Sequence, residues 1–165
     1  MAAEYSNNNL QTVIPQQNVL FTDAPVPCNR GFITHRSGSG IFTLQSIYSP
    51  YSSMNRCGCG CNSCNNTKTT EYLVTFGANI SIPTGGTVGP ISLALAINGE
   101  ILPDSTMTVT PAAVEEAFNI SRTIHVPVPT VCGCEEIAVK NISTTNVDVQ
   151  NANIVFQIPQ LNITR

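Results

Sequence analysis

Short β-rich runs separated by turn residues are the feature that most limits the fold of this chain. About ten such runs occur, at residues 18–23, 31–36, 40–47, 69–83, 90–102, 105–110, 121–128, 135–142, 145–150 and 152–159. Within the fourth run Tyr72, Val74 and Phe76 share one face, as in a half-buried strand. Asn98-Gly99 predicts a hairpin, because the turn that suits twisted strands needs positive φ at both positions. Many short strands at close spacing predict an all-β jelly-roll sandwich and exclude a parallel α/β fold.

Two segments fall outside this strand pattern. Residues 111–118, PAAVEEAF, predict a short helix of about two turns, with Pro111 at its first position, where a missing N–H costs nothing. Residues 1–17 are polar and rich in Asn and Gln, and we expect an extended N-terminal arm. The arm packs either on its own domain or on a neighbouring subunit. Residues 18–165 then form a single domain with a Cys-rich loop at residues 55–68.

The composition indicates a surface with few charges. Charged residues make up 10% of the chain, against about 25% in an average protein. Asn, Thr, Ser and Gln must therefore cover most of the surface, which suits a particle that packs against copies of itself. A net charge of -3 and the lack of a basic run argue against a nucleic-acid partner.

Compartment and cysteine content are in tension. No stretch approaches 18 apolar residues, so we expect no membrane span, and the first residues lack the basic and apolar regions of a secretory signal. Stable disulfides, however, normally belong to oxidising compartments. Synthesis in the cytoplasm followed by release through cell lysis, as for bacterial spores and phage virions, would reconcile the two observations. A reduced, metal-bound cytoplasmic protein would reconcile them differently.

The seven cysteines are the strongest chemical feature of the sequence: Cys28, Cys57, Cys59, Cys61, Cys64, Cys132 and Cys134. Only Cys61-x-x-Cys64 has the spacing of a zinc knuckle. A catalytic dithiol would need a helix after the pair, and a strand follows instead. We therefore predict no metal, no cofactor and structural disulfides, some of them between chains. Because seven is odd, at least one thiol is free, metal-bound or joined to another chain.

The remaining polar candidates predict no catalysis. His35 and His125 lie in strand-like runs and are interpreted as ordinary strand residues. The carboxylate pairs Glu115-Glu116 and Glu135-Glu136 are interpreted as solvated charge rather than acid–base groups. We predict no enzymatic activity.

Four residues are candidates for contacts between subunits. Asn29 and Arg30 follow Cys28 and adjoin a Gly-rich turn, where Arg30 can make bidentate hydrogen bonds. Val13 and Ile14 are the apolar pair of the N-terminal arm.

Four blocks of sequence carry a family resemblance. They are VLFTDAPVPCNRGFITHRSGSGIFTLQ (19–45), VTFGANISIPTGGTVGPISLALAINGE (74–100), STMTVTPAAVEEAFNIS (105–121) and VDVQNANIVF (147–156). In this order they resemble the C-terminal domain of the collagen-like glycoproteins of bacterial spore exosporia, over about residues 18–158. The resemblance implies a tumour-necrosis-factor-like jelly roll, of the same type as complement heads, usually trimeric and displayed on a spore surface. It brings no catalytic residues.

The chain departs from that family in lacking a collagen stalk, in its polar arm and in the inserted Cys-rich loop. These departures favour a self-assembling structural protein of an extracellular spore-surface layer, appendage or filament, with disulfides between subunits. Its partner would be its own kind, as a trimer or filament, with exchange of the N-terminal arm. A phage virion decoration or fibre head, or a receptor-binding jelly-roll module, is the alternative; a small zinc-dependent protein is a third.

Overall fold

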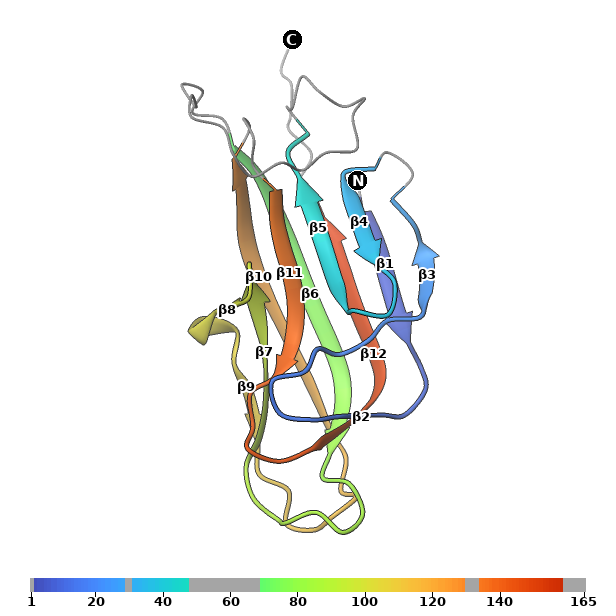
Figure 1. The fold of residues 1–165 in the computed structure, drawn as a ribbon, viewed down its shortest axis with the longest axis vertical. Coiled ribbons are helices and arrows are strands. Elements are labelled where there is room, and N and C mark those ends of the chain that lie inside the picture. Colours follow the sequence, from blue (N-terminus) through green and yellow to red (C-terminus); the bar gives the residue numbers. More distant parts are fainter. Residues whose placement is uncertain (1, 29–30, 48–68, 130–133, 159–165) are drawn as a thin grey trace.

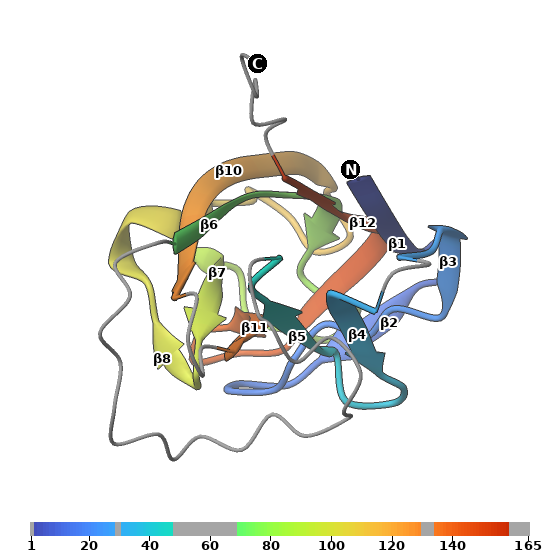
Figure 2. The same cartoon turned by 90° about the horizontal axis from the view of Figure 1, so that it is seen from above.

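The structure, a computed structural model, describes residues 2–28, 31–47, 69–129 and 134–158. Two antiparallel six-stranded sheets face each other as a sandwich, seen from the side in Figure 1 and along its long axis in Figure 2. Sheet A has the order β10-β6-β12-β1-β3, with β2 beside β12. Sheet B has the order β4-β5-β11-β7-β8, with β9 beside β7. The predicted all-β jelly-roll sandwich is confirmed.

The strands of sheet A are β1 (Ala2–Asn7), β2 (Gln11–Val13), β3 (Asp23–Val26), β6 (Thr69–Ser81), β10 (Phe118–Pro129) and β12 (Val147–Gln157). Those of sheet B are β4 (Ile33–Arg36), β5 (Ile41–Gln45), β7 (Ile91–Ile97), β8 (Glu100–Ile101), β9 (Met107–Val109) and β11 (Cys134–Asn141). A single 3-10 turn, η1 (Pro103–Ser105), is the one helical element in these ranges. It is too short to span a membrane, and no other helix occurs among the described residues.

The core fills the space between the two sheets. Strand β6 alternates along its length, and its inward residues Tyr72, Val74 and Phe76 are fully buried. They meet Phe42 of β5 and Phe156 of β12, whose ring centroids lie 5.0 Å apart. Each large side chain buried in this way contributes about 1.5–3 kcal/mol to the stability of the fold. Burial of these inward residues is therefore the main contribution that holds the two sheets together.

The hairpin predicted at Asn98-Gly99 is confirmed. Asn98 has φ 51° and Gly99 has φ 85°, and Ile97 pairs with Glu100 across the turn between β7 and β8. The Asn98 side chain also fastens the turn to β11: its amide donates to the Glu135 carboxylate, and its Oδ1 accepts the backbone N–H of Glu136 at 2.9 Å. One asparagine therefore shapes the turn and anchors it.

The runs at 145–150 and 152–159 form one strand instead of two. Strand β12 continues through both, with a register shift between Gln150 and Asn153 against β6. Gln150 faces Asn79 and Asn153 faces Gly77, so β12 carries one extra residue, and Asn151 adopts φ 53°. This β-bulge lets one strand continue through both predicted runs.

The short helix predicted at residues 111–118 is wrong. Residues 111–117 form bends and a turn, and Phe118 begins β10. Glu115 has φ 63°, and its N–H donates to the Ile82 carbonyl at 2.8 Å. The Glu116 carboxylate accepts the N–H of Ala112 at 2.6 Å. An isolated two-turn helix is marginal, and these tertiary and side-chain bonds satisfy the backbone better than helical bonds would.

The N-terminal segment connects the two sheets. Strand β1 lies between β12 and β3, and β2 pairs with the start of β12. The next residues cross to sheet B, where the N–H of Gln16 donates to Asn141 O and that of Val19 to Val139 O, both at 2.8 Å. The buried Asn141 amide donates to Val13 O at 2.8 Å. In this structure the N-terminal segment is thus packed on its own chain.

Candidate assembly surfaces

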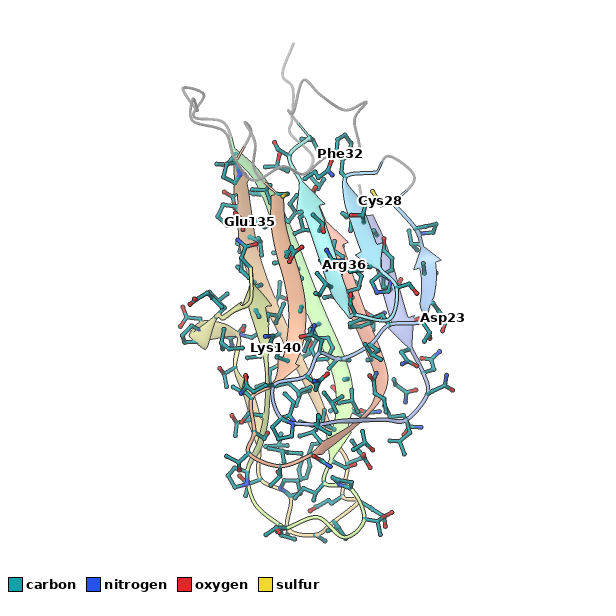
Figure 3. The ribbon with its side chains drawn as sticks, in the orientation of Figure 1. Asp23, Cys28, Phe32, Arg36, Glu135 and Lys140 are labelled. Atoms are coloured by element: carbon teal, nitrogen blue, oxygen red, sulfur yellow. The ribbon has the colours of Figure 1, made fainter. Side chains whose placement is uncertain are left out.

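The two described cysteines lie toward one end of the sandwich, called here the cysteine end. Cys28 follows β3 and packs, partly buried, against the hydrophobic core, without a disulfide among the described residues. Cys134 begins β11 and pairs with Gln45 at the end of β5. Figure 3 shows Cys28, Phe32 and Glu135, the neighbour of Cys134, all toward this end.

The other five cysteines, Cys57, Cys59, Cys61, Cys64 and Cys132, lie outside the described residues, as do Asn29 and Arg30. The strand ends that border them are described, however. Residues 48–68 join the end of β5 to the start of β6, and residues 130–133 join the end of β10 to the start of β11. Thr69 pairs with Pro129 and Gln45 with Cys134, so all four strand ends lie at the cysteine end. The chain therefore enters and leaves both cysteine-bearing segments there.

Two tyrosines line the inner side of the cysteine end. The hydroxyl of buried Tyr72 donates to the Gln45 carbonyl at 2.5 Å. Burial raises the pKa of Tyr72 well above its usual value, and proximity to Cys28 raises it further. The pKa of Tyr5 is likewise raised, first by burial and then by Cys28. Both phenols stay protonated at neutral pH, and Cys28 borders a largely apolar neighbourhood.

The two histidines differ in how far they are buried. His35, on the edge strand β4, is partly buried, whereas His125, on β10, is exposed. Among the described residues no group of three or more His, Cys, Asp or Glu side chains could hold a metal ion. The one pair with zinc spacing, Cys61 and Cys64, falls outside these ranges.

Each carboxylate of the two predicted pairs has a separate partner. Glu115 accepts the Thr84 hydroxyl at 2.6 Å, and Glu116 accepts two backbone N–H groups. Glu135 accepts the Asn98 amide, and Glu136 forms an exposed ion pair with Arg36 at 3.4 Å. The four carboxylates therefore stabilise loops and strands locally, through hydrogen bonds and one ion pair.

The outward face of sheet A is polar but nearly uncharged at its centre. It is defined here by Leu73, Thr75 and Gly77 of β6, Thr123 of β10, and Asn153 and Val155 of β12, which the strand register places side by side. Thr75 and Thr123 share a hydroxyl hydrogen bond of 2.9 Å across the strands. Three carboxylates surround this centre: Glu4 of β1, which faces Val155 and accepts the Asn153 amide, Glu71 of β6 and Asp148 of β12. Such a face can be dehydrated without stripping water from many charges.

The outward face of sheet B is charged by comparison. It carries the Arg36–Glu136 ion pair, and Lys140 lies farther along β11 (Figure 3). Charged residues are depleted at the centre of protein interfaces. Of the two broad faces, that of sheet A is the better contact surface.

Of the exposed large apolar side chains in the described residues, all but Val88 lie in the N-terminal quarter of the chain. Leu10 is 61% exposed and Ile14 is 50% exposed, and Leu20 and Val26 are also exposed. Val13, by contrast, is buried in the core of its own chain, so of the two apolar arm candidates only Ile14 presents a surface to a partner.

Sequence reasoning missed the neutral face of sheet A. The alternation in residues 69–83 indicated which residues of β6 point outward, but not which strands lie beside them. The Thr75–Thr123 and Asn79–Asn119 contacts join residues 48 and 40 positions apart, and only the strand register shows them together. Cross-strand pairing of similar polar residues was the one signal available.

Neither a scan against protein-family models nor a search of curated protein sequences finds a match. Among solved structures the chain is similar to Eiger TNF from S. frugiperda, with 12% identity and a TM-score of 0.59 over 100% of this chain and 96% of that one. It is also similar to the globular domain of zebrafish complement 1qA protein, with 12% identity and a TM-score of 0.52 over 98% of each chain. The chain therefore has the jelly-roll fold of tumour necrosis factors and complement globular domains. At this identity the likeness concerns the fold alone.

Proposed function

We propose that this protein is a self-assembling structural protein whose subunits meet through the outward face of sheet A. The observation that carries the proposal is the contrast between the centres of the two broad faces: uncharged around the hydrogen-bonded Thr75 and Thr123 on sheet A, with carboxylates only around that centre, and crossed by the Arg36–Glu136 ion pair on sheet B. Burial of the neutral face leaves few unpaired charges. The tumour-necrosis-factor-like fold supports a trimer as the first unit, since the resemblance of the sequence implies one.

Disulfides at the cysteine end would then lock neighbouring subunits. The segments that carry five of the seven cysteines begin and end there, Cys134 directly follows one of them, and Cys28 lies toward the same end. A bridge within a chain contributes about 2–4 kcal/mol, whereas a bridge between chains makes the assembly resistant to dissociation. Cross-links at one end of an elongated unit suit a layer or a filament.

Exchange of the N-terminal strand is a second proposed link between subunits. Strand β1 is joined to β2 by Asn8, Asn9 and Leu10, all of them exposed. A different path through these three residues would let β1 occupy the same place in the sheet of a neighbour, which is a low-cost route to assembly.

The setting we propose is the surface of a bacterial spore or an appendage of it, reached by cell lysis. The four sequence blocks that resemble exosporium proteins support this setting, and the cysteine content fits a particle that is oxidised after release. A virion position is the alternative.

A charge placed in the neutral face tests the proposal. Thr75→Arg puts a guanidinium at the centre of the outward face of sheet A, and Thr43→Arg puts the same group on the outward face of sheet B, where Thr43 faces Glu136. In reductant, native mass spectrometry of the wild type and of Thr43→Arg should show oligomers, and Thr75→Arg should be a single chain. If the two variants have the same oligomeric state, the interface does not lie on the outward face of sheet A. A wild type that stays a single chain with and without oxidant would reject self-assembly and favour the receptor-binding alternative.

A further inference from the structure

His35 occupies an unusual place on the edge of sheet B. Among the strands that the structure describes, its strand, β4, pairs with β5 alone, so one side of β4 has no strand neighbour there. The imidazole stacks on the buried ring of Phe42, with ring centroids 4.5 Å apart and planes 17° from parallel. Tyr5 of β1, in the other sheet, packs against it at 5.4 Å. Through these rings His35 connects β4 to β1 across the sandwich.

The buried nitrogen of this histidine has no partner. Nε2 is shielded from solvent and meets no hydrogen-bond partner among the described residues. In the charged imidazolium, Nε2 carries a proton that no acceptor receives. A cation–π contact with Phe42 offsets part of the free energy needed to bury the charged imidazolium. The buried charge without a hydrogen-bond partner nevertheless remains unfavourable.

Within the described ranges no charged group compensates for the proton. From β1 only Tyr5 faces the imidazole, because Glu4 points to the opposite face and contacts Asn153. Arg36 follows on β4 but pairs with Glu136 on the outside of sheet B, and Asp23 of β3 is exposed and accepts the Thr22 hydroxyl.

The other neighbours of His35 offer no acid either. Strand β5 and residues 17–22 contain no titratable side chain, and Phe156 is the contact of this cluster from β12. Cys28 lies beside Tyr5. Burial accordingly lowers the pKa of His35 below its ordinary value.

We propose that His35 is an acid-responsive latch that holds β4 against β1 while it is neutral and releases them when it takes up a proton. Release would free the unpaired edge of sheet B and the N-terminal strand, and expose the aromatic cluster beneath them. This inference concerns a single chain and does not depend on the proposed assembly.

The direction of the pH effect follows from the lowered pKa. Above the ordinary histidine pKa of about 6.5 the imidazole is neutral in both the closed and the open state and favours neither. As the pH falls below that value, the open state binds a proton that the closed state still refuses. The closed state therefore loses stability on acidification through this window.

Hydrogen exchange of the full chain tests the latch. Amide protection is measured in β1 and β4 at about pH 7.5 and about pH 5, corrected for the intrinsic pH dependence of exchange. Because an open-state histidine of ordinary pKa gains about 30-fold in proton binding at pH 5, protection in β1 and β4 should fall by up to about 30-fold. His35→Phe keeps a stacked ring without a titratable nitrogen and should lose this acid response. The matched control His125→Phe, on exposed β10, should keep it.

The proton uptake itself provides a second measurement on the wild type. In an NMR titration the His35 ring signal, identified as the one that remains in His125→Phe, should titrate below pH 6.5. Titration at or above that pH would overturn the proposal, and so would an acid response of equal size in His35→Phe. If His35→Phe does not fold, the titration and the wild-type exchange profile still decide: acid loosening confined to β1 and β4 supports the latch, and uniform loosening rejects it.

Discussion

Gly40 is a position where the backbone conformation and its close neighbours both require glycine. It has φ 65°, and a Cβ built on it would lie 2.2 Å from the carbonyl oxygen of Val19. That contact lies where the N-terminal segment crosses from sheet A to sheet B beside the β4–β5 hairpin. Gly38 in the same turn has φ 75° but no atom within 4 Å of such a Cβ. The two glycines separate the cost of a positive φ from the cost of a steric clash.

Urea unfolding of two variants should show this separation. Gly38→Ala should lower the free energy of unfolding by about 1 kcal/mol, the usual cost of alanine at positive φ. Gly40→Ala should lower it by more than about 2 kcal/mol, because the clash with backbone adds strain. Equal losses would show that the crossing segment moves aside freely.

Asn141 is the second residue with a decisive role. Its side-chain amide donates to Val13 O and to Thr145 O, and its Oδ1 accepts the N–H of Ser143 at 2.8 Å. Asn141→Ala should cost about 1–3 kcal/mol, because three buried or partly buried backbone groups, one in β2 and two in the turn between β11 and β12, lose their partner. The loss is measured by urea unfolding, with Asn119→Ala, at an exposed amide on β10, as the control that should change little.

At the scale of elements, alternation was a good guide to most strands and a poor guide to their ends. The predicted strand at residues 18–23 is wrong, because Asn18 forms only an isolated bridge to Lys140 and β3 begins at Asp23. The β7–β8 hairpin followed from Asn98-Gly99, because turn chemistry is local. The bulge at Asn151 and the turn at Glu115 did not follow, because both depend on bonds to distant strands. For the N-terminal arm the sequence left two readings open, a strand packed on its own domain or an arm lodged in a neighbour, since AAEYSN is mostly polar; in the structure these residues form β1 between β12 and β3.

The docking of β1 is open to test by two neighbouring substitutions. Tyr5→Ala removes a buried ring that packs on Phe42, and it should cost about 3–5 kcal/mol, as large aromatic truncations do. Glu4→Ala, on the outward face of the same strand, should cost less than about 1 kcal/mol. If the unfolding midpoint of Thr75→Arg, which disrupts the proposed contact through sheet A, still rises with protein concentration in reductant, exchange of β1 with a neighbour is supported, because exchange couples stability to association. A constant midpoint would confine β1 to its own chain.

At the scale of the whole molecule, we predict that disulfides at the cysteine end join neighbouring chains. After oxidation and boiling, denaturing gels without reductant should show a ladder of multimers that collapses to one band with reductant. Replacing Cys57, Cys59, Cys61 and Cys64 by serine should remove most of the ladder, whereas Cys28→Ser should leave most of it, since Cys28 is packed against the core. Monomer alone in every lane would contradict covalent locking, and elemental analysis of anaerobically purified protein would then test the zinc alternative.

The pairing of β1 with β12 sets the order in which this molecule can be made. Ala2 faces Gln157, so the partners of this strand pair lie almost the whole described chain apart. Pairings this distant in sequence slow folding, because the loop must close before any contact rewards it. During synthesis β1 therefore stays unpaired until β12 has left the ribosome, and sheet A is completed only then. A chaperone that shields β1 until β12 has emerged would raise the yield of folded protein.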